Sequence, residues 1–178
     1  NSPFWLFILL YLIRNGIFNI EYSAGKYLKN QYKKLAKLKS NNHNFLIHNY
    51  YPPSKKSFVI NLASKDKLIQ NKSFNLIKRA INFSNKIDAK YYSFHAGFLL
   101  DPKPNMLGKK FNKIKITNKS EAIKIFVKNV KKLNRYAKNK NVILLIENNV
   151  ITKKNLKTFK QNPLLMCDHK EIIRILKQ

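Results

Sequence analysis

Short continuous apolar runs alternate along the chain with longer stretches whose apolar residues recur at helical spacing. Strands that are buried on both faces typically read as such continuous runs, because helices cover both sides of a parallel sheet. The clearest is 141–147, Asn-Val-Ile-Leu-Leu-Ile-Glu. The runs predict five strands, at 17–23, 44–49, 90–95, 141–147 and 163–168.

The intervening stretches predict helices. Asn118 precedes Glu121 by three residues, which is close to a capping box. Ser64 is the expected N-cap of the helix before it, and Gly16 is expected to end the first helix. The predicted helices are at 4–13, 26–40, 65–87, 118–137, 152–160 and 169–178.

This alternation predicts an α/β fold in which parallel strands pack against helices. No glycine-rich loop follows the first strand, and the chain has only four glycines. A doubly wound dinucleotide-binding sheet is therefore disfavoured, because its phosphate loops need several glycines.

Polar, titratable side chains stand at the ends of all five predicted strands. The chain has eight acidic residues and four histidines, and five of these twelve fall at these positions. In parallel β/α barrels the strand ends and the loops after them form the active face. We therefore expect these side chains to converge: Glu21, His48, His95, Glu147 and Asp168.

Each of these residues also has a structural interpretation that the sequence leaves open. Glu21 is equally explained as a buried acid paired with a lysine, and His48 and His95 as core histidines bonded to the backbone. Asp168 is a suitable helix cap. Glu147 is the strongest functional candidate, because a carboxylate that closes an apolar run needs a partner.

Carboxylates and imidazoles on converging strands form a site for a divalent cation such as Mn, Mg, Zn or Co. A cation held by Glu147 and Asp168 would polarise a sugar carbonyl or hydroxyl, while another carboxylate or histidine moves a proton.

The net charge of +28 arises from 36 basic and eight acidic residues in 178. Such an excess attracts nucleic acid or anionic lipid, but a compositional bias toward Lys, Asn and Ile, with few Arg, is the favoured explanation. The single cysteine, Cys167, excludes an intrachain disulfide and fits a reducing compartment, so we expect a cytoplasmic protein. The apolar run 4–13 is shorter than the ~20 residues of a spanning helix, so no membrane span is expected, although a truncated signal or anchor remains an alternative.

Four segments in order resemble the sugar phosphate isomerase/epimerase group of the xylose-isomerase-like TIM barrels, a superfamily that also contains apurinic endonucleases. The resemblance covers nearly the whole chain and is weakest in the first dozen residues. It rests on 45–53 (Phe-Leu-Ile-His-Asn-Tyr-Tyr-Pro-Pro), 58–63 (Phe-Val-Ile-Asn-Leu-Ala), 91–98 (Tyr-Tyr-Ser-Phe-His-Ala-Gly-Phe) and 146–148 (Ile-Glu-Asn).

The resemblance implies roles for the strand-end residues. The glutamate and aspartate that end successive strands are metal ligands in the superfamily, and they correspond to Glu147 and Asp168. Histidines on earlier strands line the substrate pocket, which corresponds to His48 and His95, with Glu21 in support and His95 joining Glu147 in catalysis. The family barrel has eight strands, and five are predicted here, so residues 1–178 are expected to form a single partial barrel that is truncated at both ends.

The sequence therefore predicts a metal-dependent isomerase or epimerase of a sugar or sugar phosphate, with the activity of this partial chain by itself left open. One alternative is phosphodiester cleavage by an apurinic-endonuclease-like site, although four histidines are few for a multi-zinc cluster. Another is a non-catalytic basic protein, which would gather its lysines in one stripe with stacking aromatic residues. Among partners, a small sugar is expected, specific nucleic acid is not, and a homo-oligomer is left open.

Overall fold

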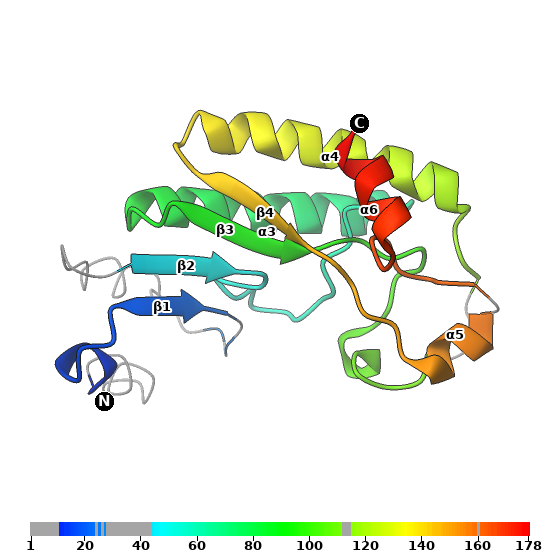
Figure 1. Ribbon diagram of the computed structural model, residues 1–178, viewed down its shortest axis with the longest axis horizontal. Coiled ribbons are helices and arrows are strands. Elements are labelled where there is room, and N and C mark those ends of the chain that lie inside the picture. The colour runs from blue at the N-terminus through cyan, green and yellow to red at the C-terminus, as the bar shows by residue number, and fades with distance from the viewer. Residues whose placement is uncertain (1–10, 24, 26, 28–43, 112–114, 160) are drawn as a thin grey trace.

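The computed structural model describes residues 11–23, 25, 27, 44–111, 115–159 and 161–178. Four strands form one parallel sheet in the order β1-β2-β3-β4, so each strand lies beside its neighbour in sequence. Figure 1 shows α3 and α4 lying along one face of this sheet. The strands are β1 Asn19–Tyr22, β2 Asn44–His48, β3 Tyr91–His95 and β4 Ile143–Glu147.

The helices follow the strands as the alternation predicts. A short 3-10 helix, η1, lies in the long segment between β3 and α4. The helical elements are α3 Lys67–Lys86, η1 Pro104–Met106, α4 Lys119–Lys138, α5 Lys153–Phe159 and α6 His169–Leu176. Apart from Tyr27, the predicted helix at 26–40 lies outside the described residues, as do residues 4–10 of the first predicted helix. Residues 11–14 are helical, and Gly16, with φ +73°, follows them in the left-handed conformation expected of a C-terminal glycine.

The two faces of the sheet have different partners. Successive residues of a strand point to opposite faces. Ile47, Tyr92 and Phe94 are fully buried on the face that α3 and α4 cover. The residues between them, such as His48, Ser93 and His95, therefore project from the opposite face, and this face carries the candidate site.

The prediction that 141–147 is buried on both faces is wrong. Ile143 is 45% exposed and Leu145 is 40% exposed, whereas Leu144 and Ile146 pack against the core. The reason is that β4 pairs with β3 alone among the described residues, and helices cover only one of its faces. An apolar run shows which side chains a strand has, but it does not show whether neighbouring elements cover both faces of that strand.

The fifth predicted strand, at 163–168, is also absent from the part of the chain that the structure describes. Leu164 forms an isolated antiparallel bridge with Phe98, and the Leu165 amide donates to the Gly97 carbonyl at 2.9 Å. This segment therefore runs beside the residues that follow β3, and it meets the chain after β4 where the Asn149 amide donates to the Met166 carbonyl at 3.2 Å. Pro163 has no amide hydrogen for a ladder, and Met166, with φ +58°, interrupts an extended conformation.

Caps fix where the two long helices begin. The Asn118 side chain accepts a hydrogen bond from the Glu121 amide, which confirms the predicted start of α4. The predicted cap of α3 is wrong by two residues: Asp66 Oδ1 accepts from the Leu68 amide at 2.7 Å, and Ser64 Oγ instead accepts from the Asp66 amide. Either residue type is a good cap, so the sequence pattern alone does not choose between them.

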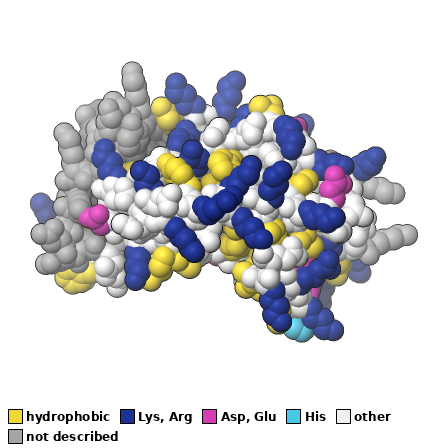
Figure 2. All heavy atoms as spheres, turned by 90° about the horizontal axis from the view of Figure 1, so that it is seen from above, with side chains coloured by type: hydrophobic (Ala, Val, Ile, Leu, Met, Phe, Trp, Pro, Cys, Tyr) yellow, Lys and Arg dark blue, Asp and Glu magenta, His cyan; other side chains and the backbone are white. Residues whose placement is uncertain are grey.

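Basic side chains are distributed widely over the surface. On the face that Figure 2 shows, Lys and Arg are scattered among polar and apolar side chains and do not gather in one stripe. No helix within the described ranges is long and apolar enough to cross a membrane.

Candidate metal centre at the strand ends

Three of the predicted site residues are the last residues of three adjacent strands. His48 ends β2, His95 ends β3 and Glu147 ends β4. His95 is directly opposite Glu147 in the parallel register, and His48 is opposite Ser93, which lies two residues before His95 on the same face. The register therefore places all three side chains on the face that the helices leave uncovered.

The Glu147 carboxylate lies between the two imidazoles. Glu147 Oε1 is 2.9 Å from His48 Nδ1, and Oε2 is 3.5 Å from His95 Nδ1. The two imidazole rings meet edge to face, with centroids 5.6 Å apart. One ligand atom from each of the three residues lies within 4.8 Å of the others. We call His48, His95 and Glu147 the strand-end triad.

Ser93 is a member of the site that the sequence reasoning missed. It is 3% exposed, and its Oγ lies 2.8 Å from His48 Nδ1. The available signal was its position two residues before His95, since alternate residues of a strand share a face. This is not the arrangement of a hydrolase triad, because Ser93 and Glu147 both contact the same ring nitrogen, whereas a hydrolase histidine bridges its partners through two.

Glu21 lies at the margin of the site. Its Oε1 is 3.8 Å from His48 Nδ1, and its side chain is 51% exposed, so it is not a buried acid. The contact places a second carboxylate beside His48, on the side opposite to β3 in the sheet order.

Asp168 lies apart from the strand-end triad, as the N-cap of α6. Its Oδ1 accepts a hydrogen bond from the Glu171 amide at 2.9 Å. That hydrogen bond, aided by nearby Lys119, holds the pKa of the Asp168 carboxyl below its ordinary value. Its function as a metal ligand stays a prediction, and the structure gives the carboxylate a capping contact instead.

Two buried asparagines hold the loops that surround the triad. Asn149 Nδ2 donates to the Ala96 carbonyl at 2.8 Å and to the Leu165 carbonyl at 3.0 Å. Asn61 Oδ1 accepts from the Phe98 amide at 3.0 Å. The segments after β2, β3 and β4 are thus bonded to one another just beyond the strand ends.

Gly97 allows these loops to approach closely. A Cβ atom added there would lie 2.7 Å from Ala63 Cβ and 2.9 Å from Asn61 Oδ1. Real Cβ atoms do not come so close, and Ala63 has no longer side chain that could move aside. The glycine of the His-Ala-Gly sequence is therefore required by contact with the loop after β2.

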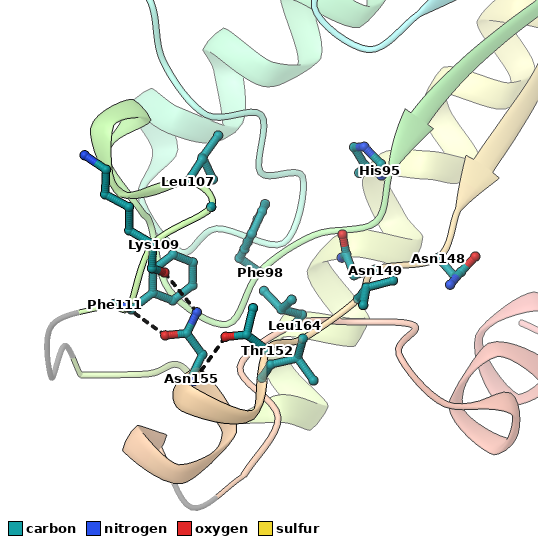
Figure 3. Close-up of a pocket in the computed structure, with 13 residues that line it drawn as sticks. His95, Phe98, Leu107, Lys109, Phe111, Asn148, Asn149, Thr152, Asn155 and Leu164 are labelled. Atoms are coloured by element: carbon teal, nitrogen blue, oxygen red, sulfur yellow. Dashed lines mark hydrogen bonds between the residues drawn. The ribbon is translucent and has the colours of Figure 1, made fainter.

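A hollow of about 330 Å³ adjoins His95. Figure 3 shows His95 at the strand end, with Phe98 and Leu164 beside the hollow. Asn155 lies on the far side of the hollow and is hydrogen-bonded to other residues that line it. Asn155 Oδ1 accepts from the Phe111 amide at 2.7 Å, and Asn155 Nδ2 donates to the Lys109 carbonyl at 3.2 Å. The hollow combines aromatic and aliphatic walls with amide groups.

Comparison with known proteins gives a family match. The family described as "Xylose isomerase-like TIM barrel" matches residues 19–177. No curated protein matches the sequence significantly.

Solved structures with the same fold are distant in sequence. A D-tagatose 3-epimerase-like protein is 15% identical with a TM-score of 0.67, over 96% of this chain and 55% of that one. An L-ribulose 3-epimerase is 14% identical with a TM-score of 0.65, over 99% of this chain and 52% of that one. A D-psicose 3-epimerase from Clostridium cellulolyticum H10, solved with D-tagatose, is 15% identical with a TM-score of 0.57, over 90% of this chain and 55% of that one.

The chain thus spans about half the length of these structures. At such identities the likeness establishes the fold, and the predicted partial TIM-type barrel is confirmed.

Proposed function

The chain belongs to the xylose isomerase-like TIM barrel family, and we propose that it functions as a metal-dependent isomerase or epimerase of a sugar or sugar phosphate. The observation that carries the proposal is the strand-end triad, which gathers two imidazoles and a carboxylate within 4.8 Å. The triad stands at the carboxyl ends of parallel strands, where β/α barrels place their reacting groups.

The donor set of the triad fits a divalent cation. Two imidazoles and one carboxylate are the ligands of many catalytic sites, and three protein ligands leave coordination positions for substrate. The two imidazoles favour a metal such as Zn or Co, whereas the carboxylate also suits Mn or Mg. A cation held by His48, His95 and Glu147 would supply the polarisation of a sugar carbonyl or hydroxyl. Asp168 would join them only if its carboxylate left the cap of α6.

The exposure of each side chain supports a different function for each of these residues. His95 is 45% exposed and lines the hollow, so the ring nitrogen that does not hold the cation is placed to donate a hydrogen bond to a substrate hydroxyl or carbonyl. His48 is 14% exposed and is held by Ser93 and Glu147, so its imidazole is better placed to hold the cation than to contact the substrate. Glu21 lies beside His48 and is half exposed, so its carboxylate is placed to accept a hydrogen bond from a substrate hydroxyl.

The hollow beside His95 suits a monosaccharide. Its volume of about 330 Å³ lies in the range of small-molecule sites. Phe98 offers an apolar surface to the C–H face of a sugar ring, and the amide of Asn148 offers hydrogen bonds to hydroxyl groups.

The test is exchange of substrate hydrogen with solvent. The protein loaded with Mn or Co would be incubated in D2O with a panel of ketopentoses, ketohexoses and their phosphates, and deuterium at the carbon next to the carbonyl would be followed by NMR. We expect incorporation for at least one substrate, and His95→Ala should slow it by about 10² or more. Melting of the variant should stay close to that of the parent, because the side chain is half exposed.

His169→Ala is the matched control, since His169 is an exposed histidine at the start of α6. It should leave exchange unchanged. Absence of deuterium incorporation across the panel would refute the proposal. A His95→Ala variant that exchanges normally but melts several degrees earlier would show that His95 is structural.

A further inference from the structure

A second hollow, of about 760 Å³, lies away from the strand-end triad. It is bounded by the loop after β2, by α3 and by Tyr136 of α4. In the described part of the chain its charged lining residues are all cations, and no acidic residue lines it. We call this hollow the basic pocket, defined by Lys55, Lys56, Lys72, Lys78 and Arg79.

Regular structure and fixed contacts hold the pocket. Lys72 and Arg79 are seven residues apart on α3 and so lie on one face of the helix. Arg79 Nη2 donates to Ser54 Oγ at 2.9 Å, which joins the loop to the helix. Lys78 Nζ lies 4.5 Å from the centroid of the Tyr136 ring, and the Tyr136 hydroxyl donates to Asn82 Oδ1 at 2.6 Å. The cations are therefore presented by two segments, the loop after β2 and α3, and α4 adds the Tyr136 ring.

The charge of the pocket is not compensated by nearby carboxylates. Within the described residues, the lysine–carboxylate ion pairs are Lys65–Glu121 and Lys119–Glu171, and neither involves a cation of the pocket. Like charges held around a concave surface repel one another and concentrate a positive potential there. A bound anion would relieve that repulsion.

We propose that the basic pocket binds a small ligand that carries two or more phosphate groups. Its cations and the hydroxyl of Ser57 offer hydrogen-bond donors to phosphate oxygens. A single phosphate would leave most of the positive charge uncompensated, whereas linked phosphates match several cations at once. The volume lies within the range of small-molecule sites.

A small ligand is favoured over a nucleic-acid strand by the shape of the charged surface. A strand needs a continuous basic track with aromatic platforms for its bases. The ring of Tyr136 is already covered by Lys78, and the basic side chains on the face of Figure 2 are scattered. The proposal is independent of the isomerase function, because no cation of the pocket lines the hollow beside His95.

The test compares two triple variants that remove the same charge from the complete chain. Lys72→Gln, Lys78→Gln and Arg79→Gln together remove the three positive charges that α3 contributes to the pocket. Lys124→Gln, Lys128→Gln and Lys132→Gln together remove three exposed lysines from α4 that do not line it. Inorganic tripolyphosphate is the probe, titrated by calorimetry at ~0.15 M salt, where the Debye length of about 8 Å screens diffuse attraction.

We expect the pocket variant to lose at least tenfold in tripolyphosphate affinity and the α4 variant to change less than threefold. The single variants Lys72→Gln and Arg79→Gln, whose side chains are exposed, should each lose part of the affinity without altering melting. Equal losses in the two triple variants, or no measurable binding by the parent, would overturn the proposal. So would single-stranded DNA that displaces tripolyphosphate and binds more tightly per phosphate, because the pocket would then belong to a nucleic-acid surface.

Discussion

Glu147 Oε1 lies 2.9 Å from His48 Nδ1, although the strands that carry the two residues do not pair with each other. β3 lies between them, so their backbones are separated by two strand spacings of about 4.8 Å each. The residue of β3 opposite His48 is Ser93, and its short side chain leaves the space in which the imidazole and the carboxylate meet. The geometry of the triad thus depends on a small residue in the middle strand.

A larger side chain at position 93 should fill that space and separate the His48 imidazole from the Glu147 carboxylate. We expect Ser93→Leu to weaken Zn or Mn binding at least tenfold, because the larger side chain would occupy the position between His48 and Glu147. Ser93→Ala keeps the space and loses only the 2.8 Å contact with His48, so its metal affinity should stay within about threefold of the parent. Calorimetric titration with each metal measures both variants. If Ser93→Ala lost as much affinity as Ser93→Leu, the hydroxyl and not the space would be the important feature.

The sequence predicted the ends of β2, β3 and β4 well, because each apolar run closes with a titratable residue that cannot continue it. His48, His95 and Glu147 were found in this way. It did not predict Ser93, since nothing in its own neighbourhood distinguishes a serine that contacts a histidine on another strand. That contact depends on the register between β2 and β3, which arises only when the strands pair.

The same pattern was misleading at 163–168. Leu164, Leu165 and Met166 are buried, as the apolar run implies, but they are buried beside the residues after β3 and not in the sheet. Burial is thus readable from an apolar run, whereas the pairing partner is not. Asp168, the titratable residue that closes this run, consequently caps α6 instead of joining the triad.

Asp168 variants should separate capping from metal binding. Asp168→Asn retains a side-chain oxygen that can accept from the Glu171 amide, so melting and metal affinity should both stay near those of the parent. Asp168→Ala loses the cap, so it should melt a few degrees earlier, again with unchanged metal affinity. A clear loss of metal affinity in Asp168→Asn would instead establish Asp168 as a ligand.

The capping contact should also be visible as a pH dependence. The hydrogen bond from Glu171 lowers the pKa of Asp168 in the folded state. Its contribution to stability is therefore present above the ordinary carboxyl pKa and is lost as the pH falls through the lowered one. Thermal melting between neutral and strongly acid pH should show a smaller loss for Asp168→Asn than for the parent, since an amide does not titrate. Equal losses would mean that other carboxylates account for the dependence.

Two buried tyrosines should respond oppositely to loss of the hydroxyl group. The Tyr92 hydroxyl donates to the Asn49 carbonyl at 2.8 Å, so Tyr92→Phe should lower the free energy of unfolding by about 1–2 kcal/mol. The Tyr51 hydroxyl is buried without a hydrogen-bond partner among the described residues, so Tyr51→Phe should leave stability unchanged or raise it by up to about 1 kcal/mol. Urea unfolding measures both. A loss in Tyr51→Phe as large as that in Tyr92→Phe would show that the Tyr51 hydroxyl is bonded in solution.

Alkaline unfolding should be linked to the buried phenols. Burial raises the pKa of Tyr22, Tyr51 and Tyr92 above the ordinary value of 10.0. In the unfolded chain these groups ionise near that ordinary value, so the stability that their neutral forms contribute is complete below pH 10 and is lost as the pH rises toward the raised values.

The lysines also lose charge in this range, which relieves repulsion and opposes the effect, so the comparison must be made between variants that share the same lysines. Tyr22→Phe and Tyr51→Phe each remove one linked ionisation, and each should move the alkaline unfolding midpoint to higher pH. Tyrosinate absorbance and circular dichroism, followed together, should show the buried phenols ionising only as helix signal is lost. Tyrosinate absorbance that rises fully before any loss of helix would mean that Tyr22 and Tyr51 are open to solvent, and the packing of the Tyr22 ring against Phe45 and Tyr51 would have to be revised.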